Sequence, residues 1–163
     1  MKNELEFLCD LILHSSEVSE NLEVFSSELR KRGLAHDRTK FQSFEFDRFL
    51  SGWEDFKKTD YGTEKYNESP DKVTEAREHH HENNRHHVGF YENGVEGMNL
   101  IDVLEMLSDW KAAARRSPNL NLEQTLDKAF DLYGIKDEQL RKVILNTFKY
   151  LGWVSSTNRR DDV

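Results

Sequence analysis

The beginning of the chain carries the longest regular pattern in the sequence, and this pattern predicts a helix. Between residues 3 and 31, mostly apolar side chains recur at spacings of three and four, which is the period of one face of an α-helix. We expect Gly33 to end this helix, because a glycine often closes a helix in the left-handed conformation. The positions on the predicted face are Leu8, Leu11, Ile12, Ser15, Val18, Leu22, Phe25 and Leu29.

The rest of the chain predicts further helices, since no alternating strand pattern persists. Only 8 Gly and 2 Pro residues argue against a turn-rich β fold, and ten Phe, five Tyr and three Trp residues can fill a core. We therefore predict an all-α fold, a single-domain helical bundle of about six helices over residues 1–152, with a polar tail over 153–163. The later helices are expected over residues 43–58, 72–83, 99–115, 122–133 and 137–151, with loops at 59–71 and 84–98.

Several residues are expected to mark the ends of these helices. The side chains of Ser43, of Asn99 and of either Asn119 or Asn121 are suited to accept a hydrogen bond from the first turn of a helix. Gly134 is placed to close the helix expected over 122–133.

Charge and cysteine content exclude several classes of protein. A formal net charge of −8 argues against a partner such as a nucleic-acid polymer, which attracts basic surfaces. The single cysteine, Cys9, excludes an internal disulfide framework and a cysteine-rich zinc site. The first apolar run is interrupted by Glu4, Glu6 and Asp10, so it predicts neither a signal peptide nor a membrane span. We expect a cytoplasmic protein without a membrane partner.

Histidines carry most of the functional information. Five of the seven lie within nine residues, in the segment HHHENNRHH at positions 79–87. Neutral imidazole is the commonest metal ligand among protein side chains, so this cluster indicates a metal site. The alternative that stays open at this point is a solvated polar turn or an accidental histidine-rich tract.

Two weaker signals precede the histidine cluster. His36 and Asp37 are adjacent and can ligate one ion together at a helix end, although Asp37 is also placed to cap the turn that follows it. His14 lies at the edge of the apolar face of the first predicted helix. A single histidine in that position is more often a buried side chain with a hydrogen-bond partner than a ligand.

An acidic stripe follows the histidines. Asp102, Glu105 and Asp109 are spaced three and four apart, so they share one face of the helix expected over 99–115. An ordinary amphipathic helix with its acids in water would give the same spacing. The flanking Met106 and Trp110 are not typical of a solvent face, which suggests that the stripe faces a site.

The order of these features along the chain resembles that of the HD-domain superfamily of metal-dependent phosphohydrolases. The features are a histidine on a first helix, a His-Asp pair, a histidine-rich segment and an aspartate on a later helix. The resemblance implies a helical metal site. Its ligands would be His14, His36, Asp37 and Asp109, with His80, His86 and His87 available for a second ion.

A second resemblance is narrower and covers about residues 10–116. The segment HHHENNRHH followed by MNLIDVLEMLSDWKAAARR is similar to an uncharacterised family of small bacterial and phage proteins, which has no settled activity. The residues that match its pattern are His80, Asn84, Arg85, His86, His87, Glu105, Asp109 and Trp110. His79 and His81 fall outside this pattern and are interpreted as flanking residues.

The resemblance to the HD-domain superfamily implies hydrolysis of a nucleotide or another small phosphate ester with one or two divalent ions, whether Mn, Fe, Co, Ni, Zn or Mg. Asp37 would bridge the ions or orient a water, and Glu105 would accept a hydrogen bond from a ligand histidine or act as a general base. The expected substrate contacts are Lys40, Asn84, Arg85 and Trp110, although a core position is the alternative for the tryptophan.

Two other functions are compatible with the same residues. Some HD-type proteins hold two irons and activate oxygen, and ligand types alone do not separate these oxygenases from hydrolases. A non-catalytic protein that sequesters a nucleotide is the second alternative, and a homodimer is left open.

Overall fold

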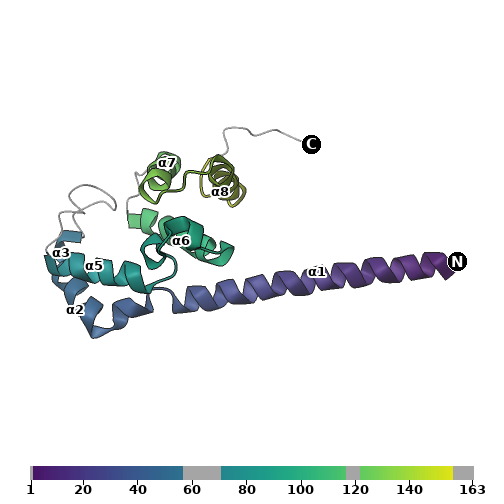
Figure 1. Cartoon of the computed structure of the whole chain (residues 1–163), viewed down its shortest axis with the longest axis horizontal. Helices are drawn as coiled ribbons and strands as arrows, with labels where there is room; N and C mark the ends of the chain where they lie inside the picture. The colour runs from purple at the N-terminus through teal and green to yellow at the C-terminus, as the bar shows by residue number, and fades with distance from the viewer. Residues whose placement is uncertain (1, 57–70, 117–121, 156–163) are drawn as a thin grey trace. The chain divides into compact units, whose positions relative to one another are not determined.

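The protein is helical wherever its structure is described. The computed structural model describes residues 2–56, 71–116 and 122–155, and all regular structure in these ranges is helical (Figure 1). The chain divides into two compact units, Met1–His36 and Asp37–Val163, which are described separately below. The predicted all-α fold class is confirmed. No helix in the described ranges is long and apolar enough to cross a membrane.

The first unit is a single long helix. Helix α1 runs from Lys2 to Ala35, so the helix predicted over 3–31 exists but extends further at its C-terminal end. The expectation that Gly33 ends the helix is wrong. Gly33 has no positive φ and remains helical, and the termination falls two residues later. The expected apolar face is present, and most of its side chains are exposed, including Leu8, Leu22 and Phe25.

The second unit contains all the other elements. The longer helices are α2 (Ser43–Ser51), α5 (Asp71–Asn83), α6 (Leu100–Ala113), α7 (Leu122–Leu132) and α8 (Glu138–Tyr150). The short helices are α3 (Trp53–Phe56) and the 3₁₀ turns η1 (Arg38–Phe41), η2 (Val88–Phe90), η3 (Gly94–Gly97) and η4 (Ala114–Arg116). With α1, six of the described helices have nine or more residues.

Several predicted boundaries need correction. The helix expected over 43–58 is interrupted at Gly52, which ends α2 before α3 begins, and residues 57 and 58 lie outside the described ranges. Ser43 is the first helical residue and not the cap, because Gln42 takes the cap position without a side-chain hydrogen bond. The loop expected at 59–71 lies outside the described residues, apart from Asp71, which begins α5.

Other predicted helix ends agree with the structure. Gly134 adopts a φ of +71° just after α7, as a closing glycine should. Asp137 caps α8 by accepting a hydrogen bond from the Leu140 amide at 2.7 Å. The candidate caps Asn119 and Asn121 lie outside the described residues.

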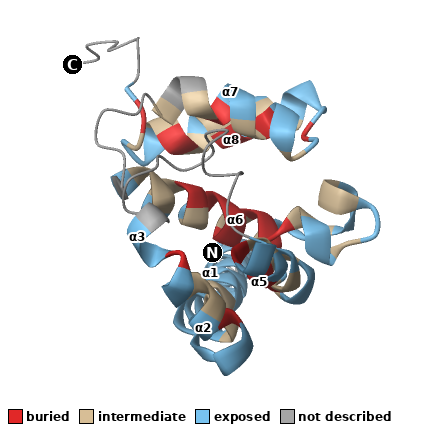
Figure 2. Ribbon diagram, turned by 90° about the vertical axis from the view of Figure 1, so that its left-hand side faces the viewer, coloured by how far each residue is buried: buried red, intermediate tan, exposed pale blue. Residues whose placement is uncertain are grey.

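Helix α6 is the central element of the second unit. In both views it lies between the pair α7 and α8 and the pair α2 and α5 (Figures 1 and 2). Its start is fixed by a capping box, in which the Asn99 side chain accepts from the Asp102 amide at 3.0 Å and the Asp102 carboxylate accepts from the Asn99 amide at 3.1 Å. The predicted cap at Asn99 is therefore confirmed.

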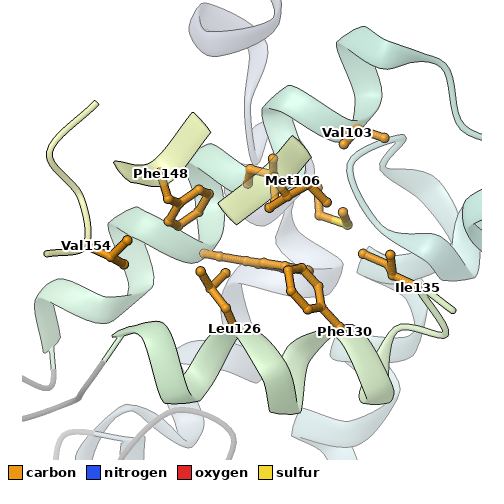
Figure 3. Close-up of a cluster of buried hydrophobic side chains, with 10 residues drawn as sticks. Val103, Met106, Leu126, Phe130, Ile135, Phe148 and Val154 are labelled. Carbon is orange, nitrogen blue, oxygen red and sulfur yellow. The ribbon is translucent and has the colours of Figure 1, made fainter. Parts of the chain in front are cut away.

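One apolar cluster joins α6 to the C-terminal helices (Figure 3). Trp110 belongs to this cluster and stacks on Tyr133 with a ring separation of 5.0 Å, so the prediction that it contacts substrate is wrong and the core alternative holds. The cluster contains Val103, Met106, Leu107, Trp110, Leu126, Phe130, Ile135, Ile144, Phe148 and Val154.

The chain continues to contribute to the core after α8. Val154 is buried, and Trp153 packs edge-on against Phe148 with the ring centroids 5.1 Å apart. The polar tail predicted over 153–163 therefore cannot begin at residue 153. Residues 156–163 lie outside the described part of the chain.

Helix α2 departs from the burial expected of an amphipathic helix. Glu45 is its fully buried residue, while the nearby Phe44, Phe46 and Leu50 are exposed in the described structure. Because a buried carboxylate is costly unless polar groups surround it, the environment of Glu45 points to a polar site between α2 and α5.

Candidate metal centre

The site begins with a residue held in an unusual backbone conformation. Asp37 has φ 58° and ψ 18°, and it is the one non-glycine residue with positive φ in the described ranges. This left-handed conformation costs about 1–2 kcal/mol for an L-residue and persists only where surrounding contacts enforce it. Although Asp37 precedes η1, its side chain makes no capping hydrogen bond. A capping role therefore does not account for this aspartate.

The Asp37 carboxylate instead faces basic side chains. Its Oδ2 pairs with Lys40 Nζ at 2.7 Å, and its Oδ1 lies 3.0 Å from His80 Nε2 and 3.5 Å from His86 Nε2. Burial alone would raise the pKa of this carboxyl, but hydrogen bonds from the His80 and His86 rings and the charge of Lys40 hold its pKa far below the usual range. These neighbours thus favour the ionised form of Asp37.

Three buried histidines gather beside this carboxylate. His80 comes from the last turn of α5, and the chain then reverses in a turn closed by the His87 amide donating to the Asn84 carbonyl at 3.0 Å. The turn brings His86 and His87 back beside His80, with ring centroids 5.7 and 4.9 Å from it. One nitrogen of each of the three rings lies within 4.8 Å of the others, which is close enough for a shared ion.

Carboxylates behind two of these rings fix their orientation. His80 Nδ1 lies 3.0 Å from Glu45 Oε2, and His86 Nδ1 lies 3.3 Å from Glu105 Oε1. Because a carboxylate can only accept, each contact favours a proton on Nδ1. Nε2 is then the ring nitrogen left for Asp37, either to donate a proton to it or, once that proton is lost, to bind a cation. Proteins commonly orient metal-ligating histidines in this way. Glu105 lies beside the His86 ring in this geometry, and its role as the partner of a ligand histidine stays a prediction.

The electrostatic setting keeps the neighbouring imidazoles neutral. Burial, reinforced by the adjacent His86, His81 and His80 rings, lowers the pKa of His87 well below its ordinary value. His81, whose ring stacks on that of His87 at 4.2 Å, has its pKa lowered to about 4, again mainly by burial. Metal ions require neutral imidazoles, and burial favours that state for His81 and His87.

Glu45 and Thr39 belong to the site and were missed by sequence reasoning. Glu45 is fully buried, and its carboxylate accepts from the Thr39 hydroxyl at 2.9 Å while facing His80 and also His79, whose Nδ1 lies 2.8 Å away. The only sequence signal for Glu45 is that it is an acid enclosed by two phenylalanines in SFEF. His79 and His81 flank the three buried histidines, as expected.

The residues predicted to contact a substrate lie in different surroundings in the structure. Lys40 lies in the site through its pair with Asp37, and its side chain is 40% exposed and so reachable by a substrate. Asn84 donates to the Thr39 hydroxyl at 2.8 Å and to the His80 carbonyl at 2.7 Å, which makes it a support for His80. The Arg85 guanidinium instead donates two hydrogen bonds, of 3.0 and 2.9 Å, to the Asp102 carboxylate. That bidentate pair gives Arg85 a structural role different from the predicted phosphate contact.

Two further predicted ligands, His14 and His36, belong to the first unit. His14 is exposed on α1 and precedes His36 by 22 residues, which corresponds to about 33 Å along a continuous helix. A single copy of α1 therefore cannot offer His14 and His36 to one ion. His36 is half-buried and ends the first unit, directly before Asp37 in the chain.

Asp109 is half-buried on α6, one turn after Glu105. In the described residues, the groups close enough to share an ion do not include Asp109, so its role as a ligand stays a prediction. The acidic stripe as a whole faces protein and not water, since Asp102 and Glu105 are both buried.

Comparison with known proteins places this chain in a family. A family model described as "Family of unknown function (DUF5662)" matches residues 3–150. The chain belongs to DUF5662. The expectation of an uncharacterised family is confirmed at this level, and the resemblance to the HD-domain superfamily stays a prediction. No curated protein and no solved structure matches the chain. The part that matches DUF5662 includes every residue of the site described above.

Proposed function

We propose that this protein is a metal-dependent phosphohydrolase that acts on a nucleotide or another small phosphate ester. One observation carries the proposal: three buried imidazoles converge beside an ionised aspartate whose side chain is still 24% exposed. A buried group of neutral nitrogen donors next to an accessible carboxylate provides both a place for a cation and an open side for a substrate.

The residues fit a divalent cation. His87 Nε2 is buried and makes no hydrogen bond with any described residue, which leaves a polar atom without compensation for its lost hydration. A cation at this nitrogen would remove that deficit. Imidazoles together with a carboxylate suit Mn, Fe, Co, Ni or Zn, whereas Mg prefers oxygen ligands. The donor set therefore favours a transition metal within the range predicted from the sequence.

Each side chain would have a definite task in hydrolysis. A bound divalent cation supplies Lewis acidity and makes a water nucleophilic near neutral pH. Asp37 balances positive charge and accepts a hydrogen bond from the attacking water, while Glu105 holds the His86 ring in position. Lys40, paired with Asp37 and partly exposed, is placed to contact a phosphoryl oxygen. His36 precedes Asp37 in the chain and is the next candidate ligand.

The test combines metal analysis with an activity panel. The purified protein is stripped, loaded in turn with Mn²⁺, Fe²⁺, Co²⁺, Ni²⁺, Zn²⁺ and Mg²⁺, and incubated with nucleotides and simple phosphate esters in air and under nitrogen. We expect metal-dependent phosphate release that does not need oxygen. Release only in air, with an oxidised product, would favour the oxygenase alternative. Tight nucleotide binding without any product would favour the sequestering protein.

Two histidine variants test whether metal binding and activity depend on the buried histidines in particular. His87→Ala should lose bound metal and at least a hundredfold in turnover, because it removes one of three buried donors. His14→Ala is the matched control, since that side chain is exposed on α1, and it should keep both. If the two variants retain equal metal and equal activity, the proposed centre is wrong.

A further inference from the structure

The apolar face of α1 has a stricter period than that of an ordinary surface helix. Positions 8, 11, 15, 18, 22, 25 and 29 alternate spacings of three and four, which is the heptad repeat of positions a and d in a coiled coil. We call these seven residues the α1 seam. Six of them are apolar, namely Leu8, Leu11, Val18, Leu22, Phe25 and Leu29.

The seam is exposed along most of its length. Leu22 is 61% exposed, Phe25 52% and Leu8 53%, and α1 forms a compact unit of its own. An apolar stripe that stays in water does not stabilise its helix, because helices in proteins are stabilised mainly by packing such a stripe against a neighbour. The seam keeps its 3.5-residue period from Leu8 to Leu29, which is about three heptads, and a heptad pattern of that length is typical of helices that pair.

The seam and its flanks match a second copy of themselves. In a parallel pair, position g of one helix faces the following position e of the other. Here that places Phe7 opposite Ile12, His14 opposite Ser19 and Asn21 opposite Ser26, so apolar meets apolar and polar meets polar. No like charges oppose each other at these positions, and the acids Asp10, Glu17 and Glu20 fall on outward positions.

Ser15 specifies the register of such a pair. It is the single polar residue of the seam and occupies an a position, where each residue faces its own counterpart in a parallel, in-register pair. A shift by one heptad would put the Ser15 hydroxyl against Leu8 or Leu22, where it would lose its hydration. From these observations we infer that α1 pairs with α1 of a second copy as a parallel, in-register, two-stranded coiled coil.

The first test uses the mass of the full-length protein in solution. Light scattering should give twice the chain mass of 19.2 kDa for the parent. Leu22→Glu should reduce it to a single chain, because the substitution puts like charges in the seam. Val24→Glu is the matched control: Val24 is 68% exposed but points away from the seam, so the dimer should persist. A monomeric parent, or equal behaviour of both variants, would overturn the inference.

The second test detects register and does not depend on the fate of the charged variants. In a Cys9→Ser background, Ser15→Cys should form a disulfide-linked dimer on mild oxidation, since the two introduced thiols would face each other. Ser27→Cys, on the opposite face of α1, should cross-link at least tenfold more slowly. Equal rates for the two positions, or no cross-link at position 15, would contradict a parallel in-register pair.

Discussion

Among single residues, Glu45 is the most demanding feature of the site. A fully buried carboxylate is tolerated here because Thr39 donates to it and two imidazole nitrogens lie within 3.0 Å of its oxygens. These contacts make Glu45 the support that turns the His80 ring toward Asp37. Its effect on metal binding should therefore be large even though it touches no ion.

We expect Glu45→Gln to lower metal affinity about 10–100-fold. Both carboxylate oxygens of Glu45 face hydrogen-bond donors, whereas a glutamine amide offers one acceptor oxygen and turns an NH2 donor toward either His79 or the pair Thr39 and His80. The free energy of unfolding of the metal-free protein should fall by about 1–3 kcal/mol, the usual cost of an imperfectly satisfied buried polar group. Competition with a chromophoric chelator measures the first quantity and urea unfolding the second. Glu75→Gln, at an acid that is 57% exposed on α5, should change neither. Equal metal affinity in the two variants would show that Glu45 does not position His80.

For single residues, the sequence predicts the candidate metal-binding histidines better than the side chains that hold those histidines in position. The density of histidines in HHHENNRHH is a local signal, and the buried His80, His86 and His87 all come from it. Glu45 pairs with His80 across 35 positions of the chain, and no local pattern marks such a contact. Arg85 fits a phosphate-binding motif by type, yet its partner Asp102 becomes visible only when α6 is packed beside it.

On the scale of elements, the Arg85–Asp102 pair joins the turn after α5 to the first turn of α6. Asp102 already completes the capping box with Asn99. Burial alone would raise the pKa of its carboxyl, but hydrogen bonds from Arg85, Tyr91 and the Asn99 amide, together with the charge of Arg85, lower it. One carboxylate thus ends a loop, starts a helix and fixes the segment that carries His86. The pair is structural support for the metal centre.

We predict that Arg85→Ala reduces the free energy of unfolding by about 1–3 kcal/mol, since it removes two hydrogen bonds to a buried charged group. The KM for a phosphate ester should stay within about twofold, because the guanidinium is engaged by Asp102. Chemical denaturation and steady-state kinetics give the two values. Arg48→Ala, which breaks a pair with the exposed Glu75, should cost less than about 1 kcal/mol. A tenfold rise in KM with unchanged stability would restore the role of phosphate contact to Arg85.

Periodicity predicts where helices form more reliably than which faces they bury. The helices over residues 72–83, 99–115, 122–133 and 137–151 appear with ends shifted by only one or two residues. Helix α2 does not follow its apolar pattern, because Glu45 is recruited to the histidines while Phe44 and Phe46 stay exposed. Burial of this kind is decided by partners distant in the chain, and so is the break at Gly52.

For the molecule as a whole, the histidine cluster makes stability depend on pH. The pKa of His81 is about 4 in the folded protein and about 6.5 in an unfolded chain, and that of His87 is also lowered. Between these values the unfolded chain binds more protons than the folded one, so stability falls as the pH decreases from 6.5 toward 4. The lowered pKa of Asp37 acts in the same direction at more acidic pH.

The metal-free protein should therefore show a melting temperature that is highest near neutral pH or above and falls steadily from pH 7 to pH 5. Thermal unfolding followed by circular dichroism, with a chelator and at high salt to screen the net charge of −8, measures this trend. His81→Gln should flatten the decline, because it removes one buried group that must stay neutral. A melting temperature that rises on acidification would contradict the neutral state assigned to these imidazoles.

At Asp37, the residue that is best for the stability of the left-handed backbone differs from the residue that the proposed reaction needs. Glycine adopts a φ near 58° freely, so Asp37→Gly would relieve the strain that Asp37→Ala would keep, a difference of about 1 kcal/mol. Both substitutions delete the carboxylate that faces His80 and His86. Selection for thermal stability alone would thus favour a glycine at this position, and the proposed activity would be lost. An aspartate that persists there under such selection would indicate that the strained conformation is maintained for the use of its side chain.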